Sequence, residues 1–77
     1  MAISTPLEPT ASNFRAELAR HRLRKEDVAS IANMHPTAFS NYLVEQRTMT
    51  QQAAERIASA INASVGYPLF STELMNP

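Results

Sequence analysis

Apolar residues recur in the middle of this chain at intervals of three and four positions, the spacing of a helix that buries one side. Within residues 25–44, KEDVASIANMHPTAFSNYLV, the residues at these intervals are Val28, Ile31, Ala32, Phe39, Tyr42 and Leu43. The positions on the opposite side carry mainly polar or charged residues. The pattern predicts two short amphipathic helices, one over residues 25–32 and one beginning at residue 36.

The residues between these two helices favour a tight turn. Asn33 tolerates the left-handed backbone conformation that often ends a helix. Pro36 is favoured at the first position of a helix, and it biases His35 towards an extended conformation. Because a linker of residues 33–35 is too short for two antiparallel helices, the helices must cross steeply, as in a helix-turn-helix. The small side chain of Ala29 would let them approach closely.

A further helix is predicted before this pair. Ser12 is a suitable N-cap for a helix over residues 13–21, in which Phe14 and Leu18 would face the core. The preceding residues 1–11 contain two prolines and few large apolar residues. We interpret them as a flexible N-terminal arm.

A fourth helix is predicted over residues 51–61, with Thr50 as its N-cap and Asn62 at its end. Its inward positions are Ala54, Ile57, Ala58 and Ile61. A short turn within residues 64–70 would complete the core, and residues 71–77 would form a C-terminal tail.

The composition favours one small all-α domain over residues 12–70. The chain has 77 residues, of which 44% are hydrophobic and one is Gly, and this suits packed helices better than a sheet. With no Cys and two His, neither a disulfide nor a structural metal site is expected. The chain also lacks a Gly-rich phosphate loop, a nucleophile elbow and an apolar stretch long enough to span a membrane. We expect a cytoplasmic protein that is not an enzyme and binds no cofactor or small-molecule ligand.

Residues 25–44 resemble the helix-turn-helix of the lambda-repressor-like family, which includes phage repressors, Cro proteins and bacterial regulators. The positions that this family keeps apolar or small hold Val28, Ala29, Ala32, Met34, Phe39 and Tyr42 here. The predicted fourth helix is also similar to that of the family, so the resemblance covers residues 13–70. It implies a compact four- or five-helix lambda-repressor-like bundle that binds double-stranded DNA by sequence. It further implies a transcriptional regulator, a phage or bacterial repressor that acts by occupying its operator.

Four residues depart from the family pattern. Asn33 stands where the family has Gly, and Pro36 stands where it often has Gln or another polar reader. Leu18 and Leu43 replace an Arg and a Glu that form an ion pair in many members. Because a buried ion pair often gains little over a packed apolar pair, this joint replacement predicts that Leu18 and Leu43 touch.

The resemblance places the base-reading residues at the start of the second helix of the pair. The expected readers are Pro36, Thr37, Ser40 and Asn41. The Asn41 amide can pair bidentately with adenine, whereas Thr37 can offer its hydroxyl to a base or phosphate and its methyl group to thymine. The alternative for Asn41 is an ordinary solvated position on a helix.

Phosphate contacts are expected around the same helix. The candidate residues are Arg24, Lys25, His35, Gln46, Arg47 and Gln51. His35 is alternatively a weak N-cap, and Arg24 and Lys25 are alternatively solubilising surface charges. Arg47 is favoured over those two because its loop follows the reading helix.

The formal net charge is zero, whereas most DNA-binding domains are basic. The basic residues are concentrated at Arg15, Arg20, Arg22, Arg24 and Lys25. The acids Glu8, Glu45, Glu55 and Glu73 lie elsewhere in the sequence, so a neutral domain can still present a basic face, although it should bind non-specific DNA weakly. The alternative function is a protein-interaction module on the same fold, an adaptor or an antitoxin-like partner, which the neutral charge and Pro36 favour.

Apolar residues near the C-terminus bear on the oligomeric state. They are Val65, Tyr67, Leu69, Phe70, Leu74 and Met75. These residues would either close the core of the domain or form an interface between two copies. We expect a monomer or a weak homodimer whose pairing is assisted by DNA.

Overall fold

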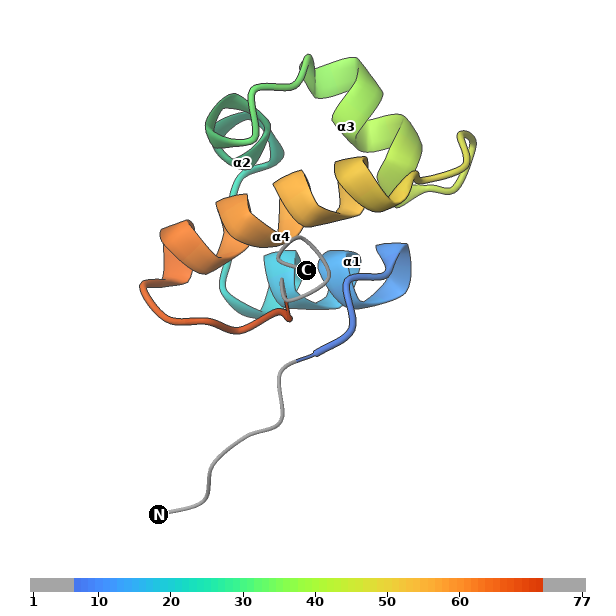
Figure 1. Cartoon of the computed structure of the whole chain (residues 1–77). Helices are drawn as coiled ribbons and strands as arrows, with labels where there is room; N and C mark the ends of the chain where they lie inside the picture. Colours follow the sequence, from blue (N-terminus) through green and yellow to red (C-terminus); the bar gives the residue numbers. More distant parts are fainter. Residues whose placement is uncertain (1–6, 72–77) are drawn as a thin grey trace.

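The computed structural model describes residues 7–71, which form four helices (Figure 1). They are α1 (Ala11–Arg20), α2 (Lys25–Ile31), α3 (Pro36–Leu43) and α4 (Gln51–Val65). α4 runs across the middle of the domain, with α1 on one side and α2 and α3 on the other (Figure 1). Within the described range no strand forms, and an isolated bridge joins Leu7 to Phe70. The predicted all-α class is confirmed, with four helices and no fifth in this range.

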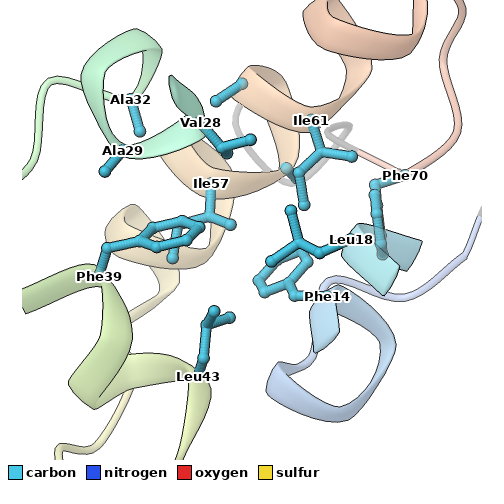
Figure 2. Packing of buried hydrophobic residues seen from close by; sticks show 12 residues of the cluster. Phe14, Leu18, Val28, Ala29, Ala32, Phe39, Leu43, Ile57, Ile61 and Phe70 are labelled. Atoms are coloured by element: carbon cyan, nitrogen blue, oxygen red, sulfur yellow. The ribbon is translucent and has the colours of Figure 1, made fainter. Parts of the chain in front are cut away.

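The core is built from one side of each helix and from Phe70 (Figure 2). Its fully buried large side chains are Phe14, Val28, Phe39, Leu43, Ile57, Ile61 and Phe70. Most inward positions predicted from helical spacing are buried. Ile31 is the exception, because it is the last residue of α2 and 54% of it is exposed. The buried side of α2 is formed instead by Val28 and Ala29, together with Ala32 after its end.

The start of α1 differs from the prediction. The Oγ1 atom of Thr10 accepts a hydrogen bond from the N–H of Asn13 at 3.2 Å, so Thr10 is the N-cap and Ser12 lies inside the helix. The side-chain amide of Asn13 donates to the Glu8 carbonyl at 3.0 Å. These two bonds close the turn before the helix and move its start to Ala11.

The start of α4 agrees with the prediction. The Oγ1 atom of Thr50 accepts a hydrogen bond from the N–H of Ala53 at 3.1 Å. α4 is nevertheless longer than expected, since it ends at Val65 and is followed by Gly66 with φ 82°. Glycine adopts this left-handed conformation without steric cost, and for that reason it commonly follows a helix.

Asn62 does not end α4, because its side chain binds the backbone of Phe70. Its Oδ1 accepts from the Phe70 N–H at 2.8 Å, and its Nδ2 donates to the Phe70 carbonyl at 3.0 Å. The ring of Phe70 packs edge-on against Phe14, with 4.8 Å between their centroids. Asn62 therefore holds a core side chain in place instead of turning the chain.

The two ends of the domain are joined through Leu7. Its N–H donates to the Leu69 carbonyl at 3.0 Å, and its carbonyl accepts from the Ser71 N–H at 2.9 Å. The last residues of the predicted arm, from Leu7 to Ala11, thus belong to the folded part. Residues 1–6 and 72–77, and with them Leu74 and Met75, lie outside the described range.

Three helices end with a residue other than Gly in the left-handed conformation. These residues are Arg22 after α1, Asn33 after α2 and Glu45 after α3, with φ of 55°, 59° and 62°. After α3, the Glu45 N–H donates to the Tyr42 carbonyl at 3.2 Å and the Gln46 N–H to the Asn41 carbonyl at 3.0 Å. This pair of bonds defines the Schellman motif. The left-handed position of that motif, held here by Glu45, is usually occupied by Gly.

Glu45→Gly is expected to raise the free energy of unfolding by about 0.5–1 kcal/mol, because it relieves the left-handed strain. The ion pair that it removes, Arg15 to Glu45 at 3.6 Å, is largely exposed and contributes little. Urea denaturation followed by circular dichroism would measure the change. Val44→Gly is the matched control and should destabilise, since Val44 has φ −95°. A less stable Glu45→Gly variant would mean that the ion pair outweighs the strain.

Candidate nucleic-acid interface

α2 and α3 are joined by a tight turn over residues 32–35. Asn33 is left-handed, as predicted, and the N–H of Met34 donates to the Ala29 carbonyl at 2.9 Å. Ala29 is fully buried, and its small side chain allows the close approach of the two helices. Figure 1 views α2 nearly along its axis and α3 from the side, so the helices cross steeply.

His35 caps α3. Its Nδ1 accepts a hydrogen bond from the Thr37 N–H at 3.1 Å, and Pro36 follows as the first residue of the helix. A neutral imidazole whose Nδ1 accepts carries its proton on Nε2. The exposed ring can therefore cap α3 and still offer Nε2–H to an external acceptor such as a phosphate.

The residues predicted to read bases lie together in one shallow groove. The groove is lined by Pro36, Thr37, Ser40 and Asn41 from α3, and by Lys25 and Glu26 from α2. Pro36 and Thr37 are exposed, whereas Ser40 and Asn41 are half-buried. A surface ligand that enters this groove would meet all of these side chains.

The polar groups of α3 in the groove are available to a ligand. Within residues 7–71, neither the side-chain amide of Asn41 nor the hydroxyl of Thr37 has a hydrogen-bond partner. The amide provides two donors and an acceptor, and the hydroxyl provides one donor and two acceptor sites. Groups of this kind match the edges of base pairs, which present donors and acceptors side by side in the major groove.

Two predicted phosphate contacts lie at the start of α2, where Lys25 also lines the groove beside α3. Arg24 and Lys25 are exposed at the start of α2. The Nε atom of Arg24 is 4.0 Å from Glu26 Oε1, with both side chains largely in solvent. Such a pair is weak, so Arg24 can turn towards a phosphate. Glu26 was not among the predicted site residues, because only the folded chain brings the first turn of α2 beside α3.

Three predicted contacts lie beyond the C-terminal end of α3. Gln46, Arg47 and Gln51 are exposed there. The guanidinium of Arg47 lies over the Tyr42 ring, 5.7 Å from its centroid, and the Gln51 amide donates to Glu55 at 3.4 Å. Arg47 and Gln51 also line a hollow of about 620 Å³. The predicted phosphate contacts therefore lie in three places: His35 at the start of α3, Arg24 and Lys25 at the start of α2, and Gln46, Arg47 and Gln51 after α3.

Acidic side chains lie among the cations of the basic stretch from Arg15 to Lys25. Three of its cations lie close to carboxylates: Arg15 to Glu45 at 3.6 Å, Arg20 to Glu17 at 3.7 Å and Arg24 to Glu26 at 4.0 Å. Glu17 also lies 3.3 Å from the His21 Nε2, and its side chain is only 9% exposed. Helical spacing and the turn after α3 bring these acidic side chains beside the cations, which partly offsets the positive charge of the stretch.

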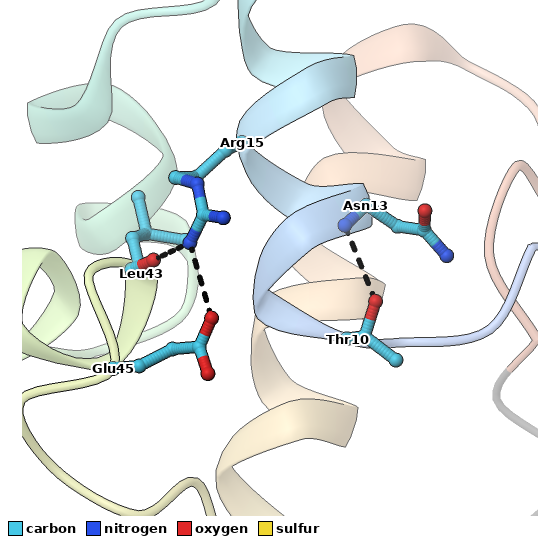
Figure 3. A network of polar contacts seen from close by, with 5 residues as sticks. All are labelled: Thr10, Asn13, Arg15, Leu43 and Glu45. Atoms are coloured by element: carbon cyan, nitrogen blue, oxygen red, sulfur yellow. Dashed lines mark hydrogen bonds and ion pairs between the residues drawn. The ribbon is translucent and has the colours of Figure 1, made fainter.

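Arg15 joins α1 to the end of α3 (Figure 3). Its Nη1 donates to the Leu43 carbonyl and lies 3.6 Å from Glu45 Oε2. The last carbonyls of a helix lack partners within the helix and carry partial negative charge, so a guanidinium is favourable there. The sequence offered no signal for this contact, which joins residues 28 positions apart.

Leu18 and Leu43, the two residues expected to touch, lie in the same region. Leu18 and Leu43 are both buried in the core, and both line a shallow hollow between α1 and α3. Arg15 holds the backbone of α3 just outside them. The polar link between these helices thus runs through Arg15, while Leu18 and Leu43 remain apolar.

As far as residues 7–71 are concerned, no helix has both the length and the apolar character needed to cross a membrane. Over the same range, His, Asp and Glu form no cluster of three that could hold a metal ion. Comparison of the chain with protein-family models, with curated proteins and with solved structures finds no match.

Proposed function

We propose that this chain binds double-stranded DNA by sequence and acts as a transcriptional regulator, a phage or bacterial repressor that occupies its operator. In this proposal α2 and α3 are a helix-turn-helix, and the four helices have a lambda-repressor-like arrangement. The observation that carries the proposal is the groove in which Thr37, Ser40 and Asn41 lie with unpaired polar groups beside Lys25.

The dimensions and surroundings of α3 support this role. An α-helix with its side chains is about 10–12 Å across, and the major groove of DNA is about 12 Å wide. The side chains of Thr37 and Asn41 face outward from α3, opposite the buried Phe39 and Leu43. Polar and charged side chains near both ends of α3 can contact DNA phosphates, and these contacts would fix which bases α3 faces.

Retardation of genomic DNA fragments in a native gel, with excess random duplex as competitor, tests the proposal. Sequence-specific binding should retard a few fragments at competitor levels that release the rest. Equal retardation of every fragment, or none, would contradict it.

Arg47→Ala is expected to weaken binding to matched and mismatched sites alike, because a phosphate contact carries no base information. The slope of log affinity against log salt concentration should fall in magnitude by about one. Fluorescence anisotropy titrations at several salt concentrations would measure both effects. Arg20→Ala removes the same charge at the end of α1, outside the groove, and should leave the slope unchanged. An unchanged slope for Arg47→Ala would remove Arg47 from the interface.

The alternative is a protein-interaction module on the same fold. The neutral net charge and the pairing of Arg15, Arg20 and Arg24 with carboxylates favour it. An adaptor or antitoxin-like partner should retain no DNA fragment selectively in the gel experiment.

The placement of the C-terminal apolar residues supports a monomer or a weak dimer that pairs on adjacent DNA half-sites. Phe70 is used in the core of its own domain and Leu69 is half-buried, whereas Tyr67 is 49% exposed. Of the described C-terminal apolar residues, only Tyr67 is largely exposed, so these residues leave little apolar area for a tight interface. Analytical ultracentrifugation at micromolar concentration should show mainly monomer, and a tight dimer would contradict this expectation.

A further inference from the structure

The side chains of α3 in the groove carry no charge. α3 has the sequence PTAFSNYL and contributes Pro36, Thr37, Ser40 and Asn41 to the groove. Guanine is most often read by Arg or Lys, which donate to its O6 and N7 atoms. α3 has neither residue, so it lacks the usual means of selecting a G·C pair.

The same side chains suit an A·T pair. The unpaired amide of Asn41 can donate to adenine N7 and accept from its N6 amino group. Thymine differs from cytosine in the groove by its methyl group, which makes favourable contacts with apolar groups. Thr37, which carries a methyl group, and Pro36, which has an apolar ring, are both exposed and line the groove.

The two charged residues of the groove come from α2. Lys25 is its first residue, and Glu26 is its second. Glu26 is an acceptor for exocyclic amino groups, which adenine and cytosine carry and guanine lacks in the major groove. Lys25 is the only cation in the groove and lies on α2, from which it serves the DNA backbone in the proposed function.

We propose that the base pairs facing α3 in the recognised DNA are A·T, read in the major groove through adenine N6 and N7 and through thymine methyl groups. This inference rests on the proposed function. It assigns Asn41 to adenine, and Thr37 and Pro36 to thymine.

Selection from a library of random duplexes, followed by titration of the enriched duplex, tests the inference. Three probes follow: the enriched duplex itself, duplexes in which one dT at a time is replaced by dU, and duplexes in which one A·T pair at a time is replaced by inosine·C. Uracil lacks only the methyl group of thymine. Inosine·C keeps the minor-groove pattern of A·T but presents that of G·C in the major groove.

The inference predicts an enriched site with a run of A·T pairs at its reading positions. At one or two of these thymines, dU should weaken binding about fourfold, the effect expected for one buried methyl group. Inosine·C should weaken binding at the adenine read by Asn41. Thr37→Ser keeps the hydroxyl and removes the methyl group, so it should make binding insensitive to dU at one of the thymines.

The remaining outcomes are distinct. Enrichment of G·C pairs at the reading positions would overturn the inference and leave DNA binding intact. Full tolerance of both dU and inosine·C would also overturn it, because the preference for A·T pairs would then come from the minor groove or from DNA shape. A lack of any enriched sequence would overturn the proposed function, and the inference with it. Circular dichroism of Thr37→Ser confirms that the variant is folded before its titration.

Discussion

Leu43→Glu is expected to lower the free energy of unfolding by about 3–5 kcal/mol, since it places an unpaired carboxylate in the core. Leu43 is 1% exposed and lies among the buried side chains that link α1, α3 and α4 (Figure 2). A domain of this length has a total stability of about 4–12 kcal/mol, so much of the variant should be unfolded. Thermal and urea denaturation would measure the loss. Val44→Glu adds the same charge at the next residue, which is 53% exposed, and should change stability little.

Adding Leu18→Arg to Leu43→Glu is expected to restore part of this stability. Leu18 is buried and lines the same hollow as Leu43, so an arginine at this position can bring its guanidinium to the new carboxylate. The double variant should be more stable than the sum of the two single changes predicts. Simple additivity would show that these two positions do not interact.

Asn41→Ala is expected to remove the preference for one base pair. The loss of binding free energy on the selected site should be about 1–3 kcal/mol, the usual value of a bidentate base contact. Such a loss corresponds to roughly 5- to 160-fold weaker binding. On a site already mismatched at that pair, affinity should hardly change. Alanine favours the helix, so the variant should remain folded.

Arg47→Ala is the matched control for this experiment. It should weaken both sites equally, because it removes a charge outside the reading groove. If Asn41→Ala keeps the full ratio of affinities between matched and mismatched sites, the reading face has been assigned wrongly.

Local chemistry made several features of the fold predictable. Pro36 at the first position of α3, Thr50 as a cap and the left-handed Asn33 each depend on neighbouring residues alone, and all three were predicted correctly. The buried positions followed from helical spacing because each helix packs on one side only. The prediction that Ile31 is buried was wrong, because α2 ends at this residue.

Other features depend on contacts between distant segments, and the sequence does not reveal these. Asn62 was expected to end α4, but the helix runs on to Val65 and Gly66, and the Asn62 side chain instead binds the backbone of Phe70. The contact of Arg15 with the Leu43 carbonyl is of the same kind. The presence of Glu26 in the groove likewise depends on how α2 meets α3.

The sequence indicated which side chains share the groove on α3, but not which acidic residues lie close to the neighbouring cations. The resemblance placed Pro36, Thr37, Ser40 and Asn41 together, and these residues line one groove because they share one side of α3. The neighbouring cations appeared unopposed in the sequence. Folding brings Glu17, Glu26 and Glu45 close to three of them, and two of these carboxylates, Glu26 and Glu45, lie beside α3.

Nuclear magnetic resonance of the ¹⁵N-labelled protein during titration with the selected duplex would show whether α3 enters DNA. If it does, the largest shifts should fall on the amides of Thr37, Ser40 and Asn41 and on the Asn41 side chain, with smaller shifts near Lys25 and Arg47. Shifts confined to the hollow lined by Met49, Thr50 and Glu55, with α3 unaffected, would contradict it.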